Sequence, residues 1–214
     1  MNDLFEGISG REKLGEQAFV LRGFALSVAE ILLAEVRNVE SISPLRHMET
    51  PGGFRMSVAT TNCGTLGWIS DRRGYKYTAV DPITHNPWPS MPDVFLTLAT
   101  SAAREAGFNS FVPNACLINQ YIPGTKLSLH QDKDERDFSQ PIVSVSLGVP
   151  ATFQFGGFER TAAKSKVPLF QGDVVVWGGV DRLRYHGILP LKRNDHALLG
   201  EKRINLTFRW ASLN

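Results

Sequence analysis

The chain has 214 residues, of which 43% are hydrophobic and 21% are charged, and its formal net charge is +2. This composition is ordinary for a soluble globular protein, and no long apolar run indicates a membrane span. The net charge is too small to indicate a nucleic-acid-binding protein without local basic clusters. The length predicts a single domain, residues 1–214, with a sizeable core.

The N-terminus has no basic region followed by an apolar core, so no secretory signal is expected. The two cysteines, Cys63 and Cys116, form no CxxC motif and lie in apolar or small-residue surroundings. We therefore expect packed free thiols, a reducing compartment and a cytoplasmic protein.

The N-terminal part predicts a lead-in, a strand and a helix. Residues 1–17 are expected to be loose, and 18–24 to form a short strand. Apolar residues at helical spacing then predict an amphipathic helix over 28–40. Ser27 is the predicted N-cap, and Glu30 would complete a capping box.

Residues 50–80 form a zone of turns and short strands. We expect a strand over 54–60, a turn over 62–64, and a second strand in which Tyr75 and Tyr77 share a face. Aromatic rings interleaved with arginines and lysines suit single-stranded nucleic acid, because bases stack on rings and phosphates pair with cations. Two hairpins whose aromatics pack on a core would have the same pattern.

The remaining chain predicts a second helix, residues 93–106, and then many short strands. The expected strands span 115–121, 126–132, 141–148, 152–155, 172–179 and 203–209. Two helices followed by such strands, separated by glycine and proline, indicate a mainly β fold with flanking helices. We expect a double-stranded β-helix, or jelly roll.

Three residues have the types and spacing of a metal site. In a strand over 126–132, His130 and Asp132 would point to the same face, and His186 follows in the motif Arg-Tyr-His-Gly. Two imidazoles and one carboxylate form the ligand set of non-heme Fe(II) oxygenases, with three positions left open. The same residue types also hold zinc in hydrolases, and a His-x-Asp motif alone is common by chance.

The last predicted strand has one apolar and one polar face. Its polar face carries Arg203, Asn205, Thr207 and Arg209. An arginine fork suits a carboxylate through two parallel hydrogen bonds, although an edge strand with a solvated face would look similar. A metal triad beside such an arginine suggests an iron enzyme that uses 2-oxoglutarate.

In the order of its motifs the chain resembles the AlkB family of 2-oxoglutarate-dependent nucleic acid demethylases. The resemblance extends over about residues 15–210 and includes Thr50-Pro-Gly-Gly-Phe, Asn119-Gln-Tyr121, Leu127-Ser-Leu-His130-Gln-Asp132-Lys-Asp134, Gly172-Asp-Val-Val-Val-Trp and Asn205-Leu-Thr-Phe-Arg209. One departure is Ile204, which is commonly aromatic in relatives. Because Ile204 lies on the apolar face, we expect altered packing there and unchanged chemistry.

The resemblance implies a ligand set and a co-substrate site. Fe(II) would be held by His130, Asp132 and His186. Arg209 would bind the far carboxylate of 2-oxoglutarate, and Arg203 would lie near the metal carboxylate and the C1 carboxylate. Further co-substrate contacts are expected from Tyr75, Lys76, Tyr77, Asn119, Tyr121 and Asn205.

The resemblance also implies a substrate site under a flexible lid at about residues 50–80. Trp68 would stack on the damaged base, Tyr75 would contact the nucleic-acid backbone, and Asp134 would accept a hydrogen bond from the exocyclic amine of the base. Arg160 is a further expected substrate contact.

The expected reaction is oxidative demethylation of 1-methyladenine and 3-methylcytosine in single-stranded DNA and RNA, and in damaged duplex DNA, by a monomer. O₂ and 2-oxoglutarate would yield succinate, CO₂ and formaldehyde, with ascorbate supporting the reaction in vitro.

Two other interpretations fit these residues. A 2-oxoglutarate oxygenase for a protein or small molecule would keep the metal site and Arg209 but would not need Trp68 or Tyr75. A non-catalytic jelly-roll module would bind neither iron nor 2-oxoglutarate. The histidines outside the predicted triad are assigned to surface or loop positions: His47, His85 and His196.

Overall fold

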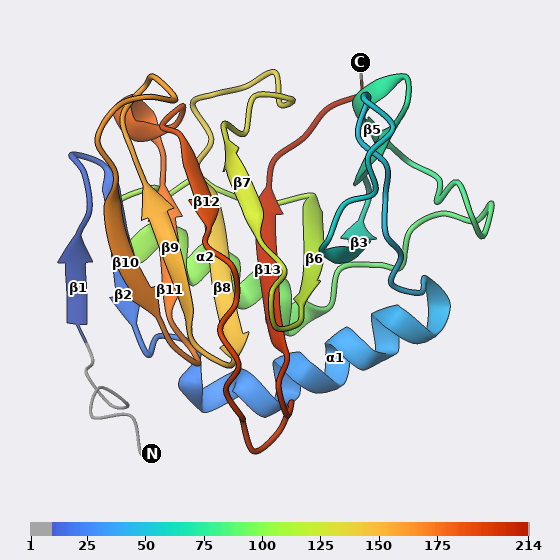
Figure 1. The fold of residues 1–214 in the computed structure, drawn as a ribbon, viewed down its shortest axis with the longest axis horizontal. Helices are drawn as coiled ribbons and strands as arrows, with labels where there is room; N and C mark the ends of the chain where they lie inside the picture. Colours follow the sequence, from blue (N-terminus) through green and yellow to red (C-terminus); the bar gives the residue numbers. More distant parts are fainter. Residues whose placement is uncertain (1–9, 214) are drawn as a thin grey trace.

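A computed structural model describes residues 10–213 as two antiparallel sheets packed face to face, with two helices on the outer side of the larger sheet (Figure 1). From edge to edge, the larger sheet contains β1 (Gly10–Lys13), β2 (Ala18–Arg22), β11 (Val174–Trp177), β8 (Ile142–Gly148), β13 (Arg203–Arg209), β6 (Ala115–Tyr121) and β3 (Ala59–Gly64). The smaller sheet contains β10 (Ser165–Leu169), β9 (Ala151–Phe155), β12 (His186–Ile188) and β7 (Leu127–His130). This arrangement confirms the predicted jelly roll.

Three further pairs of elements complete the described chain. The long helices are α1 (Ala29–Ile42) and α2 (Asp93–Glu105), the 3-10 turns are η1 (Leu26–Val28) and η2 (Gly179–Asp181), and a separate hairpin consists of β4 (Gly67–Asp71) and β5 (Gly74–Thr78). Within residues 10–213, neither helix is long and apolar enough to cross a membrane.

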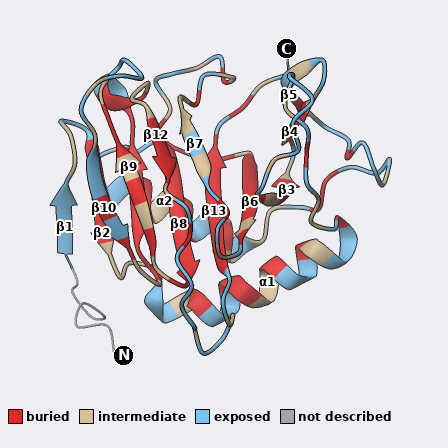
Figure 2. Cartoon of the chain, in the orientation of Figure 1, coloured by how far each residue is buried: buried red, intermediate tan, exposed pale blue. Residues whose placement is uncertain are grey.

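The larger sheet is buried on both faces along its central strands (Figure 2). In β11, Val174 and Val176 pack with the helices, whereas Val175 and Trp177 pack against the smaller sheet. A strand with two covered faces needs a continuous apolar run, which explains the sequence Val-Val-Val-Trp. Polar residues on the inner faces therefore need a partner or a function.

Several local predictions at the N-terminal end were wrong. Helix α1 begins at Ala29 after η1, and its N-cap, Val28, makes no side-chain hydrogen bond, so Ser27 and Glu30 form no capping box. Part of the predicted loose lead-in is the edge strand β1, which pairs with β2. Residues 1–9 of that lead-in lie outside the described residues.

The strand predicted over 54–60 lies further along the chain. Phe54 is exposed, and β3 starts at Ala59 and includes the predicted turn at 62–64. The Asn62 side chain explains the difference, because it exchanges two hydrogen bonds of 3.0 Å with the backbone of Trp68. Asn62 thereby ties β3 to the β4–β5 hairpin instead of forming a turn.

The two cysteines and the remaining histidines take the predicted settings. Cys63 on β3 lies opposite Cys116 on β6, and both are buried free thiols. The other histidines lie outside the named strands and helices, at His47, His85 and His196.

Asp81 fixes the segment after β5 to the end of α1. Its carboxylate is fully buried and accepts hydrogen bonds from Ser43 Oγ at 2.6 Å, from both terminal nitrogens of Arg46, and from the backbone N–H of Ile83. Burial alone would raise the pKa of Asp81, but these donors outweigh burial and lower the pKa to about 2.

Asp81→Asn is expected to reduce the free energy of unfolding by about 2 kcal/mol at pH 7. Because the folded-state pKa is depressed, this contribution is present above about pH 4 and disappears as the pH falls toward about 2. Urea unfolding at pH 7 and pH 3 measures both effects. Glu49→Gln is the control, because Glu49 and Arg72 form an exposed pair worth under about 0.5 kcal/mol; equal losses in both variants would contradict the prediction.

Candidate active site

Two neighbouring strands of the smaller sheet bring the predicted metal ligands together. His130 ends β7 and is paired in register with His186 at the start of β12, and their ring centroids lie 4.4 Å apart. Asp132 follows the end of β7, so the prediction that the strand continues to 132 was wrong. The potential ligand atoms of all three residues nevertheless lie within 4.8 Å of one another.

Backbone carbonyls orient both imidazoles. Nδ1 of His130 lies 2.9 Å from the carbonyl oxygen of Ser128, and Nδ1 of His186 lies 3.0 Å from that of Arg184. An Nδ1–H that donates there leaves the Nε2 lone pair free as a ligand. The two Nε2 atoms lie 3.5 and 3.7 Å from the oxygens of Asp132.

Electrostatics keep the buried ligands in the protonation states that bind metal. Burial would raise the pKa of Asp132, but Arg209 and the two histidines outweigh it and hold this pKa well below its usual range. Burial, together with nearby His130, lowers the pKa of His186 to about 3. A carboxylate and a neutral imidazole are the forms that coordinate a divalent cation, so the donor set fits Fe(II).

The two arginines of β13 have different surroundings. Arg209 directs Nη2 and Nε to the same oxygen of Asp132, at 3.0 and 3.2 Å, and its Nε also lies 3.5 Å from Glu135. Arg209 is therefore already paired with the metal-ligand carboxylate. β13 is also a central strand between β8 and β6, so the edge-strand interpretation was wrong.

Arg203 is buried with much of its hydrogen-bonding capacity unused. It is 1% exposed, donates from Nη2 to Ser146 Oγ at 3.0 Å, and lies over the ring of Tyr121 at 4.8 Å. Among the described residues, Nε and Nη1 of Arg203 and the hydroxyl of Tyr121 have no hydrogen-bond partner. Such buried donors mark a place for a carboxylate, so the residues also fit 2-oxoglutarate.

Comparison with known proteins identifies the family. The model of the 2OG-Fe(II) oxygenase superfamily matches residues 17–209. The alpha-ketoglutarate-dependent dioxygenase AlkB of Salmonella typhimurium is 56% identical over 99% of both chains. The chain belongs to the AlkB family of 2-oxoglutarate- and Fe(II)-dependent dioxygenases.

More distant relatives include two ALKBH1 proteins. The nucleic acid dioxygenase ALKBH1 of Mus musculus is 33% identical over 58% of this chain and 30% of its own. The solved structure of OsALKBH1 superimposes with a TM-score of 0.79 at 28% identity, covering 94% of this chain and all of that chain.

The amides predicted to contact the co-substrate lie side by side on β6 and β13. Asn119 and Asn205 are paired in register, with Asn119 Nδ2 3.5 Å from Asn205 Oδ1. Asn205 Nδ2 donates to Ser144 Oγ at 2.8 Å and to the carbonyl of Val145 at 2.9 Å. Both amides lie on the same face of the sheet as Arg203, because the even-numbered neighbours Ile118, Ile204 and Leu206 pack with the helices.

The β4–β5 hairpin of this AlkB-family chain is hydrogen-bonded to the loop that follows β7. Trp68 stacks on Tyr75 with ring centroids 5.5 Å apart, and its indole N–H donates to Asp134 at 2.8 Å. Tyr77, on the same face of β5 as Tyr75, is buried and donates its hydroxyl proton to Glu135.

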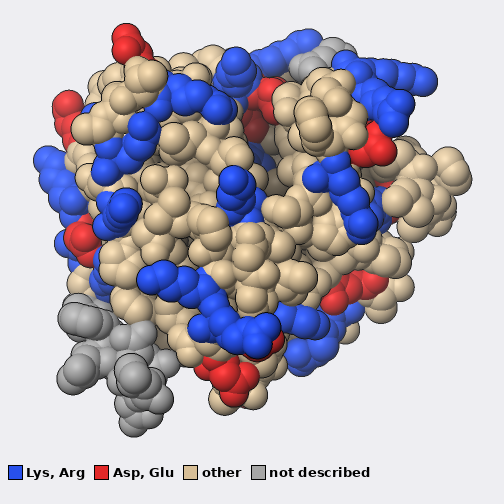
Figure 3. Space-filling view, in the orientation of Figure 1, with Lys and Arg blue, Asp and Glu red and all other residues tan. Residues whose placement is uncertain are grey.

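Lys76 and Arg160 occupy more exposed positions. Lys76 lies 3.4 Å from Asp71, and its contact with the co-substrate stays a prediction. Arg160 donates to the backbone carbonyl of Leu129 on β7, which places it next to His130. Lys and Arg side chains are spread over this face of the molecule instead of forming one patch (Figure 3).

Two buried charged residues had no role in the sequence-based prediction. Glu135 and Arg182 are 4% and 2% exposed and pair at 3.0 Å. The only sequence signal was the position of Glu135 beside the predicted metal motif, where a charge normally indicates a solvated loop.

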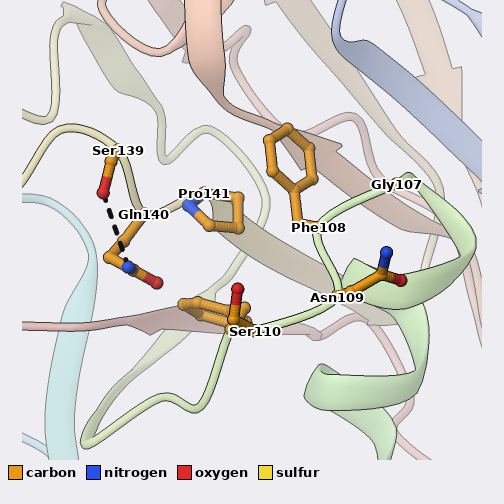
Figure 4. A pocket seen from close by; sticks show the side chains of 8 residues that line it. Gly107, Phe108, Asn109, Ser110, Ser139, Gln140 and Pro141 are labelled. Atoms are coloured by element: carbon orange, nitrogen blue, oxygen red, sulfur yellow. Dashed lines mark hydrogen bonds between the residues drawn. The ribbon is translucent and has the colours of Figure 1, made fainter.

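A cavity of about 360 Å³ lies elsewhere, between the loop after α2 and the residues that precede β8 (Figure 4). Its lining includes Phe108, Ser139 and Gln140 and none of the metal ligands. This cavity is therefore separate from the candidate active site.

Proposed function

We propose that this chain is a repair dioxygenase that removes N-linked methyl groups from bases in DNA and RNA. The observation that carries the proposal is the cluster of His130 with buried Asp132 and His186, beside the partly unpaired guanidinium of Arg203. When bound, Fe(II) would supply the activation of O₂, with 2-oxoglutarate giving two electrons and leaving as succinate and CO₂. One oxygen atom would end in succinate and the other in a C–H bond of the N-methyl group, and the hydroxymethyl product would release formaldehyde.

For the two arginines we propose the reverse of the roles assigned from sequence. Arg203 would bind the far carboxylate of 2-oxoglutarate, together with the Tyr121 hydroxyl, since both have unused hydrogen-bonding groups. Arg209 would hold Asp132 in its ligand orientation through the hydrogen bonds already present. A charge-assisted bidentate pair would satisfy the buried donors of Arg203.

The substrate site would be formed by the lid, residues 50–80, and the loop that contains Asp134. The methylated forms of adenine and cytosine named above are cationic, so an aromatic face and a carboxylate suit them. In the free protein the Trp68 indole N–H donates a hydrogen bond to the Asp134 carboxylate. The exocyclic amine of the bound base would replace the indole as the donor. A paired base must leave the stack to reach this site, so unpaired bases bind at lower cost.

A demethylation assay tests the proposal. The protein is incubated with Fe(II), ascorbate, 2-oxoglutarate and a single-stranded oligonucleotide that carries one 3-methylcytosine. The mass of the oligonucleotide is then measured by mass spectrometry. Loss of one methyl group is expected, with an unmethylated oligonucleotide as the control. Succinate formation without methyl loss would favour a protein or small-molecule oxygenase.

Trp68→Ala is expected to raise the KM for the oligonucleotide by about 10- to 100-fold, because base–ring stacking is worth about 1–3 kcal/mol. Turnover of 2-oxoglutarate without substrate should persist, since Trp68 contacts none of the metal ligands in the described chain. Parallel measurement of succinate and demethylated base separates the two effects. Trp68→Phe is the matched control that keeps a ring, and coupled activity in Trp68→Ala equal to wild type would contradict the lid assignment.

We further propose a single-domain monomer that acts in the cytoplasm. The two buried free thiols support a reducing compartment. Light scattering of the purified protein tests the oligomeric state, and cell fractionation tests the location.

A further inference from the structure

Arg182 links the two chain segments that supply metal ligands. It follows η2, four residues before His186, and its side chain is almost completely buried. Its Nη1 donates to the backbone carbonyl of Asp132 at 2.6 Å, and its Nε donates to the backbone carbonyl of Gln140 at 2.9 Å. One guanidinium thus contacts the Asp132 loop near both of its ends.

The Asp132 loop needs such a contact because the sheet does not hold it. β7 ends at His130, and no named strand occupies the residues from there to β8. The position of Asp132 relative to His186 therefore depends on side chains. A second tie between these segments is the Gln131 side-chain amide, which donates to the carbonyl of Leu183 at 2.6 Å.

The remaining guanidinium nitrogen of Arg182, Nη2, is linked to the lid through Glu135. Nη2 donates to Oε2 of Glu135 at 3.0 Å, while Oε1 of Glu135 accepts from the Tyr77 hydroxyl and lies 3.5 Å from Arg209 Nε. A buried carboxylate is costly unless it is paired. Arg182 provides that pairing, which allows Glu135 to hold Tyr77 on β5 and Arg209 beside Asp132.

The Arg182 backbone is itself well anchored. Its N–H donates to the carbonyl of Gly179 at 3.1 Å. Asp181, which is fully buried, accepts from the backbone N–H of Gln17 at 2.6 Å and from the Arg184 side chain. The Arg182 backbone is therefore anchored, through Asp181, to the residue that precedes β2 of the larger sheet.

We propose that Arg182 is a positioning residue that sets the spacing between Asp132 and His186 before metal binds, and that joins the lid to the metal ligands through Glu135. This inference rests on the proposed function, because it requires that His130, Asp132 and His186 hold the metal. The Arg182 side chain bonds the backbone of Asp132 and not its carboxylate, so its effect should be seen in metal affinity itself.

The test measures Mn(II) binding to full-length protein by electron paramagnetic resonance, without 2-oxoglutarate, in wild type, Arg182→Gln and Arg182→Lys. Mutation of a residue that orients a metal ligand typically lowers metal affinity by about 10- to 100-fold. We expect the Kd to rise by about that factor in Arg182→Gln and by less in Arg182→Lys, which retains a charge and part of the bonding.

Arg22→Gln is the matched control. Arg22 also pairs with a buried carboxylate, Asp173 at 2.7 Å, but it lies on β2 and contacts none of the metal ligands in the described chain. Its loss should lower the melting temperature while leaving the Kd unchanged, which separates positioning from general destabilisation.

The Mn(II) Kd of each variant tests whether Arg182 positions the metal ligands. An unchanged Kd in both Arg182 variants would overturn it, and so would an equal rise in Arg22→Gln. If Arg182→Gln does not fold, a raised or unchanged Kd in Arg182→Lys decides in the same way. Absence of Mn(II) binding by the wild type would instead overturn the metal site itself, and with it the positioning role of Arg182.

Discussion

Asp132→Ala is expected to abolish demethylation, a loss of more than about 100-fold. The substitution removes the carboxylate ligand, whose two oxygens lie within 3.7 Å of the two histidine Nε2 atoms. It also leaves the buried guanidinium of Arg209 without its main partner, so a folded-state cost should accompany the loss of activity. The demethylation assay on 3-methylcytosine measures the loss of activity, metal analysis of the purified protein measures the loss of the metal, and thermal unfolding measures the folded-state cost.

Metal removal gives the complementary result. A chelator should abolish wild-type activity, and added Fe(II) should restore it in the wild type but not in Asp132→Ala. Asp137→Ala is the control on the same loop, since Asp137 bonds only to Ser139 and Gln140 among the described residues and should keep wild-type activity. Substantial demethylation by Asp132→Ala would show that the cluster is not the metal site.

Arg203→Met is expected to weaken 2-oxoglutarate binding strongly without destabilising the free protein. Losing one partner of a buried charge pair costs about 2–5 kcal/mol, which corresponds to a rise in the KM for 2-oxoglutarate of about 30-fold or more. In the free protein, however, Arg203 is buried with two unsatisfied nitrogens, so an apolar side chain should leave the free energy of unfolding unchanged or raise it by about 1 kcal/mol. Succinate formation against 2-oxoglutarate concentration, and thermal unfolding without ligand, measure the two effects.

Arg209→Met is the control that distinguishes the two arginines. It would leave the buried carboxylates of Asp132 and Glu135 without this cation, so it should lower stability and turnover together. The assignment made from sequence predicts the opposite pattern, with the larger KM effect in Arg209→Met. That result would restore Arg209 as the ligand of the far carboxylate.

The sequence predicted the parts of this protein that depend on local pattern and residue type. The alternation of β13 correctly placed Ile204 in the core and Arg203 on the inner face, because a strand has a period of two in any fold. The residue types His130, Asp132 and His186 indicated the chemistry, and the order of motifs indicated the family. Helix capping at Ser27 failed because η1 precedes α1 and moves its first turn.

Only the tertiary structure decided how the charged groups are paired. Arg203 and Arg209 share one strand face, and the local pattern does not distinguish them. In the structure, Arg209 is hydrogen-bonded to Asp132, 77 residues away, whereas Arg203 keeps two donors without a partner among the described residues. The same is true of Arg182 and Glu135, which are 47 residues apart and together form a buried pair. Local periodicity determines which side chains share a face, whereas burial and charge pairing depend on which strands and loops become neighbours. Those neighbours assign the roles within the site.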